Sequence, residues 1–263
     1  MPATEKAGPT TTLVVPCHNE ADRLDVAAFA SFVTANPNMR LVLVDDGSRD
    51  GTRGVLDTIQ STAGERVAVV CLAQNRGKAE AVRQGLQRAI ADGADFAGFW
   101  DADLATPLDA VASFVELLST RPALEIVMGS RVLLLGRSID RRPVRHYAGR
   151  VFATAASAVL ELPVYDTQCG AKMFRVTPSL ERVLDRPFLS SWVFDVEIIA
   201  RYGSLTPPYT PGPLRDCIYE LPLLQWRDVE GSKVKWIDFA KAMVDLARIR
   251  STYIGFTRAA AAR

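Results

Sequence analysis

Short apolar runs that alternate with amphipathic stretches constrain this sequence most strongly. The apolar runs before residue 130 are Thr12–Val15, Leu41–Val44, Val67–Leu72, Phe96–Trp100 and Glu125–Met128. Stretches with helical periodicity lie between them, at residues 21–35, 52–62, 78–91 and 108–119. Short buried strands that alternate with helices predict an α/β fold with a mostly parallel, doubly wound sheet. In such sheets, ligands bind beyond the carboxyl ends of the strands.

The chain of 263 residues is long enough for one α/β domain with a substantial core. We predict a disordered tail at residues 1–9, a single domain at residues 10–250 and a C-terminal tail at residues 251–263.

The regular alternation weakens after residue 130. Residues 203–217 are rich in proline and glycine and are predicted to form a loop. Residues 232–249 are predicted to form a final helix. Its expected apolar stripe consists of Ile237, Ala240, Val244 and Ala247.

Composition excludes several classes of protein. The net charge of +1 provides no global field for nucleic acid, so no nucleic-acid partner is expected. The four cysteines and two histidines lack the spacing of a zinc site, and the cysteines do not resemble a disulfide framework. We expect no signal peptide, because the N-terminus lacks an apolar segment. We also expect no transmembrane helix, since the longest candidate, Val151–Leu160, is too short.

Carboxylates follow three of the predicted strands. The first strand ends in Pro16-Cys17-His18-Asn19-Glu20, the second in Asp45-Asp46-Gly47-Ser48 and the fourth in Asp101-Ala102-Asp103. Parallel strands bring these groups to one edge of the sheet, where their mutual repulsion requires cations or hydrogen-bond donors.

Asp101 and Asp103 are candidate ligands of a divalent metal. If the strand ends there and turns, both carboxylates can reach one ion, and oxygen ligands beside phosphates favour Mg²⁺ or Mn²⁺. Such an ion would stabilise a diphosphate leaving group. Alternatively, Asp101–Asp103 is a capping turn before Pro107, and Asp45–Ser48 is an N-cap turn.

Cationic residues occur at two further places. Asn75-Arg76-Gly77-Lys78 opens a helix and suits an anion. Residues 131–150 contain six arginines and one acid, Asp140, which suits phosphate recognition or a solvated loop. The adjoining apolar stretch, Tyr147–Leu160, suits a core helix or an interfacial helix. The motifs GxxxxGK[ST], GxGxxG, GxSxG and HExxH are absent, which argues against dinucleotide enzymes, serine hydrolases and zincins.

The order of the motifs is more specific than any one of them. The strings VVPCHNE, LVDDGS, NRGKAEAVRQG, DADLATP, GSR, DTQCGAKMFR, FDVEI and EGSKV occur in this order along the chain. The chain resembles family-two glycosyltransferases over residues 11–250. It resembles most the dolichyl-phosphate glucose and mannose synthases and their bacterial polyprenyl-phosphate relatives, and DTQCGAKMFR and WVFDVEI point to the glucosyltransferase branch.

The resemblance implies a GT-A fold with a Rossmann-like, mostly parallel sheet flanked by helices, an inverting mechanism and a divalent metal. Carried over by motif, the nucleoside-binding residues are Pro16, Asn19, Glu20, Asp45 and Asp46. Lys78 would lie near the nucleotide or sugar, Asp101 and Asp103 would hold metal and diphosphate, and Gln168 and Asp195 would line the sugar site. Arg131, together with Arg145 of the arginine-rich segment, would meet the acceptor phosphate.

The chain departs from the family pattern in two places. Mannose-transferring relatives often have Gln where this chain has Ala105, so UDP-glucose is favoured as donor, with GDP-mannose as the alternative. Many bacterial relatives have two C-terminal transmembrane helices, which this sequence lacks. We therefore expect a cytoplasmic protein that associates peripherally with the cytoplasmic face of a membrane.

A polyprenyl phosphate is the expected acceptor. A phosphate monoester is mostly ionised at neutral pH and needs no general base, unlike a sugar hydroxyl. One alternative is a glycosyltransferase with a soluble hydroxyl acceptor, in which Asp195 or Glu197 acts as base. Others are a nucleotidyltransferase and a non-catalytic module that binds nucleotide sugars. Arg131 also has a structural alternative, in which it only pairs with a nearby carboxylate at the strand end.

Overall fold

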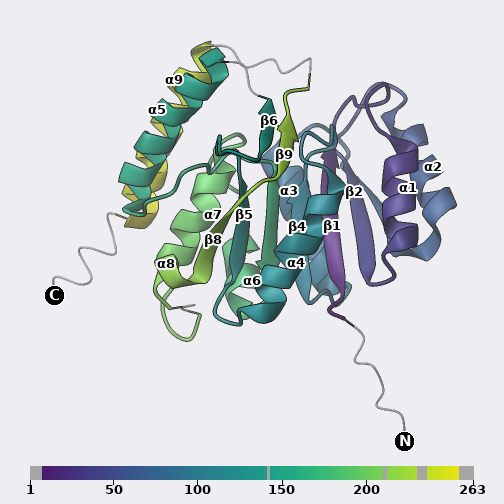
Figure 1. Ribbon diagram of the computed structural model, residues 1–263, viewed down its shortest axis with the longest axis horizontal. Helices are drawn as coiled ribbons and strands as arrows, with labels where there is room; N and C mark the ends of the chain where they lie inside the picture. Colours follow the sequence, from purple (N-terminus) through teal and green to yellow (C-terminus); the bar gives the residue numbers. More distant parts are fainter. Residues whose placement is uncertain (1–7, 141–142, 210–211, 230–235, 255–263) are drawn as a thin grey trace, which may run out of the picture.

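A seven-stranded sheet forms the centre of the computed structural model, which describes residues 8–140, 143–209, 212–229 and 236–254 (Figure 1). The strand order is β3-β2-β1-β4-β7-β5-β8. The strands are β1 (Thr11–Cys17), β2 (Met39–Asp45), β3 (Val67–Cys71), β4 (Phe96–Trp100), β5 (Ile126–Ser130), β7 (Ala171–Arg175) and β8 (Ile218–Pro222).

The sheet is parallel except at β7. β1 pairs in parallel with β2 and β4, and Cys17 lies opposite Asp45, so these strands end at one edge. β7 runs antiparallel between β4 and β5. The expected α/β fold with a mostly parallel central sheet is confirmed, although the sequence pattern did not predict β7, β8 or the reversed strand.

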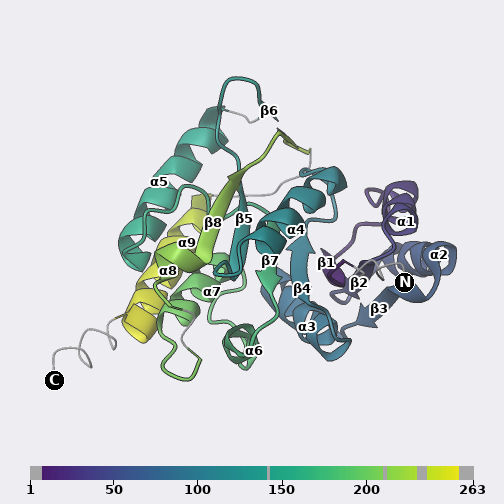
Figure 2. The same cartoon turned by 60° about the horizontal axis from the view of Figure 1, so that its bottom comes forward.

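Helices cover both faces of the sheet (Figure 2). One face packs against α1 (Val26–Ala35), α2 (Thr52–Ala63) and α4 (Val111–Thr120), which follows the 3₁₀ turn η2 (Leu108–Ala110). The other face packs against α3 (Lys78–Ala91), α6 (Pro178–Leu184) and α7 (Phe194–Gly203). The helices α5 (Pro143–Leu160) and α9 (Trp236–Ile249) lie side by side and contact α7.

α3 lies unusually close to the sheet. A Cβ atom on Gly85 would be 2.2 Å from Cγ1 of Val14 in β1, so only glycine allows this approach. The close packing brings the first residue of α3, Lys78, to the edge where the carboxylates lie.

Smaller elements differ from the sequence expectation. A two-stranded sheet joins β6 (Ser138–Asp140) to β9 (Gln225–Arg227), and η1 (Gly64–Arg66) precedes β3. The predicted loop at residues 203–217 was wrong at its end, where Pro213 caps the short helix α8 (Leu214–Cys217).

The predicted stripe of the last helix was also wrong. Ala240, Val244 and Ala247 are exposed, whereas the larger Leu246 and Ile249 pack inward with Ala242. The side chain of the fourth predicted member, Ile237, lies outside the described residues. Both stripes have helical spacing, but burying leucine and isoleucine removes more apolar surface from water.

The chain ends fall partly outside the described residues. Residues 1–7 of the predicted N-terminal tail and residues 255–263 of the predicted C-terminal tail lie outside them, and Arg250–Ile254 form a π-helical segment, η3. No helix within the described ranges is long and apolar enough to cross a membrane.

Candidate active site

Two cavities meet at the turn that follows β4. Each has a volume of about 300 Å³, and both are lined by Asp101 and Asp103. The first cavity lies over the ends of β1 and β2, and the second lies between β5, α5 and β9. The predicted site residues that line the first cavity are Pro16, Glu20, Asp46, Lys78, Asp101 and Asp103.

The chain turns directly after β4, as the metal-site hypothesis requires. The Leu104 N–H donates to the Asp101 carbonyl at 3.2 Å, and Leu104 has a φ of +52°. The Ala105 N–H donates to Oδ1 of Asp103 at 3.1 Å. A Cβ atom on Gly170 would be 1.8 Å from Oδ2 of Asp101, so glycine makes room for this carboxylate. The turn therefore presents both aspartates to the cavities.

Lys78 neutralises part of the charge at this turn. Its Nζ donates to Oδ1 of Asp101 at 2.5 Å. Burial disfavours the ammonium charge, but the surrounding carboxylates, led by Asp101 and Asp195, outweigh it and raise the pKa of Lys78. Burial and the charge of Asp101 raise the pKa of Asp103. The turn thus retains an unbalanced negative charge that favours a bound cation.

Asp46 shapes the first cavity from behind. Its carboxylate accepts the N–H groups of Arg76 and Gly77 at 2.7 and 2.8 Å, which fixes the start of α3. Glu20 lines the same cavity and pairs with Arg23. Burial raises the pKa of Glu20.

Asn19 and Asp45 hold loops together instead of lining this cavity. Oδ1 of Asn19 accepts the Arg49 N–H at 2.9 Å, and Oδ1 of Asp45 accepts the Ser48 N–H at 2.9 Å. Asp45 therefore closes a turn, but it does not cap the next helix, because α2 has Gly51 at its N-cap and no side-chain cap hydrogen bond. The pattern did not single out His18, which lines the first cavity and whose Nδ1 lies 2.8 Å from the Asp46 carbonyl oxygen.

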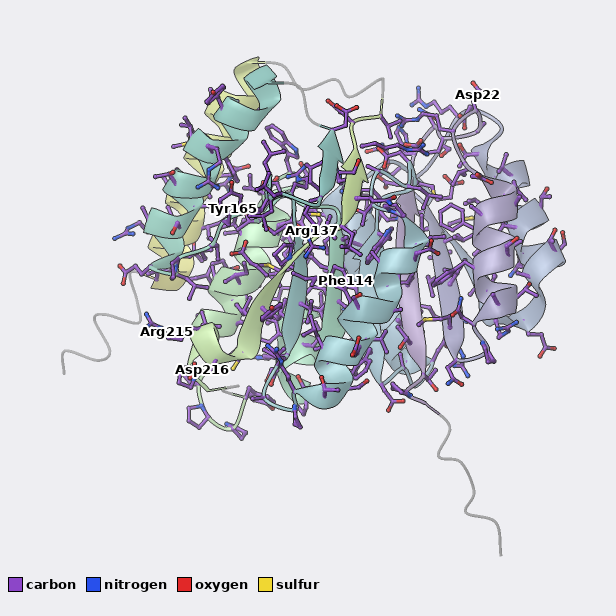
Figure 3. The ribbon with its side chains drawn as sticks, in the orientation of Figure 1. Asp22, Phe114, Arg137, Tyr165, Arg215 and Asp216 are labelled. Carbon is purple, nitrogen blue, oxygen red and sulfur yellow. The ribbon has the colours of Figure 1, made fainter. Side chains whose placement is uncertain are left out.

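The second cavity combines a polar floor with apolar walls. Arg131 and Gln168 line it beside Asp101 and Asp103. Tyr165, which lies against Arg150 of α5, is also part of the wall (Figure 3). The remaining apolar and aromatic lining includes Phe152, Ala153, Trp192, Val193 and Trp226.

Arg131 is held by a carboxylate that sequence reasoning did not single out. Its Nε and Nη2 donate to the two carboxylate oxygens of Asp166 at 2.7 and 2.8 Å. Its guanidinium carbon lies 5.3 Å from the ring centroid of Trp226. Burial opposes the charge, but Asp166 outweighs it and raises the pKa of Arg131. The guanidinium is therefore fixed, charged and in contact with the cavity.

Asp195 lies behind the second cavity in a buried ion pair. Nζ of Lys172 in β7 donates to Asp195 Oδ1 at 2.5 Å and to the Cys169 carbonyl at 2.7 Å. Gln168, which does line the cavity, donates to Oδ2 of Asp195 at 3.4 Å. Burial raises the pKa of Asp195 despite Lys172. The only sequence signal for Lys172 was a lysine inside the apolar run AKMFR.

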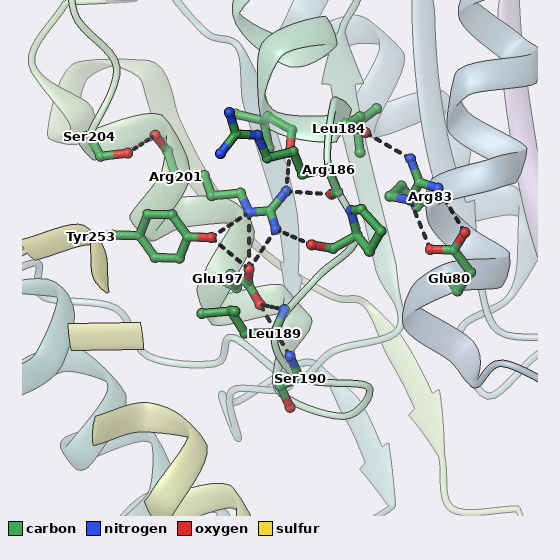
Figure 4. A network of polar contacts seen from close by, with 12 residues as sticks. Glu80, Arg83, Leu184, Arg186, Leu189, Ser190, Glu197, Arg201, Ser204 and Tyr253 are labelled. Carbon is green, nitrogen blue, oxygen red and sulfur yellow. Dashed lines mark hydrogen bonds and ion pairs between the residues drawn. The ribbon is translucent and has the colours of Figure 1, made fainter. Parts of the chain in front are cut away.

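Glu197 belongs to a structural network (Figure 4). It is fully buried, and its carboxylate accepts from Arg201, from the Tyr253 hydroxyl and from the N–H groups of Leu189 and Ser190. These contacts tie the loop before α7 to the C-terminal segment. The structure therefore does not bring Glu197 to either cavity.

Two predicted features cannot be placed. The side chain of Arg145 lies outside the described residues, although its backbone belongs to α5. The EGSKV motif, at residues 230–234, also lies outside them.

Known proteins share these motifs and this architecture. Residues 12–181 match the family model described as Glycosyl transferase family 2. The chain belongs to this family. This result confirms the family that the motif order predicted, and the chain is a glycosyltransferase.

Curated relatives resemble the chain over most of its length. The dolichyl-phosphate beta-glucosyltransferase of Saccharomyces cerevisiae is 31% identical, covering 92% of this chain and 75% of the relative. The Drosophila melanogaster protein of the same name is 32% identical, over 85% of this chain and 68% of the relative. The human protein of that name is 28% identical, over 92% and 75%.

Solved glycosyltransferase structures share the fold. The glucosyl-3-phosphoglycerate synthase of Mycobacterium tuberculosis matches with a TM-score of 0.65 and 19% identity, covering 95% of this chain and 82% of that chain. A mannosyltransferase from Pyrobaculum calidifontis, solved with GDP-Man and Mn²⁺, matches with a TM-score of 0.57 and 18% identity, over 87% and 59%. The expected GT-A fold is confirmed.

Proposed function

We propose that this glycosyltransferase moves glucose from a nucleotide sugar to a dolichyl-type polyprenyl phosphate with inversion. The observation that carries the proposal is the pair of cavities that share Asp101 and Asp103. The first has charged lining residues that include Lys78, which suits a nucleotide diphosphate. The second has aromatic walls and a fixed arginine, which suits a phosphate attached to an apolar chain.

Asp101 and Asp103 are the residues that would hold a divalent metal, Mg²⁺ or Mn²⁺. Their oxygens and the surplus negative charge fit such an ion, and Gly170 leaves the space that the Asp101 carboxylate occupies. No group of three or more His, Cys, Asp or Glu side chains within the described ranges could hold a metal, so further ligands would come from diphosphate and water. When bound, the metal would stabilise the nucleoside diphosphate as it leaves.

Three residues of the chain would bind the donor and the acceptor. Lys78 neutralises charge between Asp101 and the donor diphosphate. Gln168, held by Asp195, faces the cavity as a hydrogen-bonding partner for sugar hydroxyls. Arg131 attracts the acceptor phosphate toward a site that Asp101 and Asp103 would otherwise make repulsive.

A phosphate acceptor also fits the carboxylates at the site. Attack by a hydroxyl requires a general base, for which Asp195 and Glu197 were the candidates. Asp195 is paired with buried Lys172, and Glu197 is buried in the network around Arg201. A phosphate oxygen that is already ionised needs no general base, so neither Asp195 nor Glu197 has to accept a proton.

The acceptor places the enzyme at a membrane surface. A polyprenyl tail stays in the bilayer, so the protein must reach the headgroup level. The arginine-rich segment 131–150 supports peripheral binding at the cytoplasmic face, where anionic lipids are concentrated.

A donor and acceptor panel tests the proposal. Purified protein with Mg²⁺ or Mn²⁺ is given UDP-glucose or GDP-mannose, with polyprenyl phosphate, 3-phosphoglycerate or no acceptor. We expect glucose transfer from UDP-glucose to polyprenyl phosphate. Tighter calorimetric binding of GDP than of UDP would overturn the donor assignment, and transfer only to 3-phosphoglycerate would establish a soluble acceptor.

A further inference from the structure

The connection between β5 and β6 holds three consecutive leucines in solvent. Leu133, Leu134 and Leu135 are 56%, 48% and 104% exposed. The Arg137 N–H donates to the Leu134 carbonyl at 3.1 Å, and Gly136 has a φ of +78°. These features define a tight turn with Leu135 at its tip. We call residues 132–137 the leucine loop.

A fourth exposed leucine belongs to the segment that is hydrogen-bonded to the residue after the leucine loop. The Ser138 N–H at the end of the leucine loop donates to the Leu224 carbonyl at 2.9 Å, and Leu224 is 64% exposed. Exposure of several leucines to water is unfavourable, so an apolar patch of this kind marks a surface that contacts an apolar partner or a membrane.

The leucine loop is adjacent along the chain to a residue that lines the second cavity. Arg131, directly before the loop, and Trp226, two residues after Leu224, both line that cavity. Figure 1 shows β6, β9 and the N-terminal end of α5 at one end of the molecule. The leucine loop and the second cavity therefore lie in the same region of the molecule.

The charge around the leucine loop identifies its partner. Arg137, which is labelled in Figure 3, belongs to the loop, and the sequence of segment 131–150 contains six arginines against one acid, Asp140. An apolar tip that is followed by Arg137, in a segment whose sequence has a net positive charge, suits an anionic bilayer. A second copy of the chain would instead bring two segments of net positive charge together, and the two would repel each other.

We propose that the leucine loop inserts Leu133, Leu134 and Leu135 into the interfacial layer of an anionic membrane and holds the second cavity open at headgroup level. The inference rests on the proposed polyprenyl phosphate acceptor. Because the prenyl tail stays in the bilayer, its phosphate reaches Asp101 only if the cavity mouth lies at the membrane surface.

The test replaces all three leucines by serine. Three proteins are floated with phosphatidylcholine vesicles that contain phosphatidylglycerol. They are the wild type, the triple variant with Leu133→Ser, Leu134→Ser and Leu135→Ser, and the control Tyr209→Ser. Tyr209 is 40% exposed and lies in the connection from α7 to α8. Figure 3 shows Arg215 and Asp216 of α8 at the end of the molecule opposite β6. We expect the triple variant to lose at least about tenfold in vesicle binding, while the control binds like wild type.

Two further measurements separate the possible outcomes. In the variant Leu135→Trp, brominated lipids should quench more tryptophan fluorescence than they quench in the wild type, which has only the native tryptophans. The triple variant should melt like wild type, keep its rate on a short water-soluble polyprenyl phosphate and lose rate on a long-chain one in vesicles. Unchanged flotation and no added quenching would overturn the inference while leaving the activity standing. Leucine-dependent flotation without transfer to any polyprenyl phosphate would instead reject the proposed function alone.

Discussion

Asp101 is the residue at which the two cavities converge. It pairs with Lys78 on one side, and Gly170 leaves space for its carboxylate on the other. Asp103 follows in the same turn and carries a carboxyl group whose pKa is raised by burial and by Asp101. Two close carboxylates with one lysine form an arrangement that becomes more favourable when a cation arrives.

Asp103→Asn should reduce turnover by at least about a hundredfold, the usual scale for losing a key electrostatic group. Removal of metal with EDTA should have a similar effect. The exposed Asp109, in the turn before α4, provides the matched control Asp109→Asn, which should retain activity. Full activity of Asp103→Asn in the presence of EDTA would show that the metal role is wrong.

Arg131→Ala should raise the acceptor KM or lower kcat by roughly two orders of magnitude, about 2–3 kcal/mol for a charge-assisted contact. UDP affinity should change little, because Arg131 lines only the second of the two cavities. Acceptor kinetics, UDP calorimetry and thermal unfolding on the same variant provide the measurement.

Two companion variants separate acceptor binding from the ion pair with Asp166. Arg131→Lys keeps the charge but loses the two-pronged geometry, so part of the acceptor defect should remain. Asp166→Asn weakens the pair but leaves the cation, so its acceptor defect should be smaller than that of Arg131→Ala. If Arg131→Ala weakens donor and acceptor binding equally and only lowers the melting temperature, Arg131 is purely structural.

At the scale of elements, β7 and α7 support the second cavity. The antiparallel strand β7 brings Lys172 to the first turn of α7, where Asp195 lies. The loop before α7 carries Trp192 into the cavity wall, and Glu197 and Arg201 hold its backbone (Figure 4). The rigidity of the cavity therefore depends on buried polar contacts between elements.

Lys172→Met should destabilise the protein by about 3–5 kcal/mol, because it leaves Asp195 buried without its partner. Chemical denaturation measures the loss. The double variant Lys172→Met with Asp195→Leu should recover much of the stability, since an apolar pair replaces a buried ion pair. It should not recover activity, because Gln168 loses the partner that holds it. Wild-type stability of Lys172→Met would contradict the buried pair.

Glu80 and Arg83 form an ion pair within α3, the helix that begins with Lys78. The side-chain hydrogen bond from Arg83 lowers the pKa of Glu80, and Arg83 also donates to the Leu184 carbonyl of α6. A carboxyl group whose pKa is lower in the folded state stabilises the folded protein at pH values above its unfolded-state pKa of about 4.3. This stabilisation is lost as the pH falls through the folded-state pKa. Glu80→Gln should therefore cost about 1–2 kcal/mol near neutral pH and little at strongly acidic pH. Denaturation of both proteins across pH measures this, and a pH-independent difference would refute it.

At the scale of the whole molecule, the fold collects its functional groups at one end. The parallel strands β1, β2 and β4 deliver their carboxylates to the same edge, and β6 and β9 extend that end beyond the main sheet (Figure 1). The leucine loop lies there as well. Donor, acceptor and membrane would therefore approach from one side.

Vesicle binding should depend on anionic lipid and on salt. The net positive charge of segment 131–150 is attracted by a negative surface potential, and this attraction is screened within about 10 Å at 0.1 M salt. We expect flotation on anionic vesicles to fall as salt rises, and Arg137→Gln to reduce it further. Equal flotation on neutral and anionic vesicles would contradict the electrostatic contribution.

Local patterns determined much of this protein. Apolar runs and helical periodicity predicted five strands of the main sheet and the helices between them, because burial of apolar side chains follows the period of each element. Parallel topology then placed the residues after β1, β2 and β4 at one edge. The order of the motifs indicated the family.

Only the tertiary structure decided the rest. Periodicity does not encode strand direction or neighbours, so antiparallel β7 between β4 and β5 was not predicted. The partners of Arg131 and Lys172 lie 35 and 23 residues away in sequence, and no local signal links such pairs. Whether a conspicuous charged residue faces a cavity, as Arg131 does, or holds a loop, as Glu197 does, depends on which side chains packing brings within hydrogen-bonding distance.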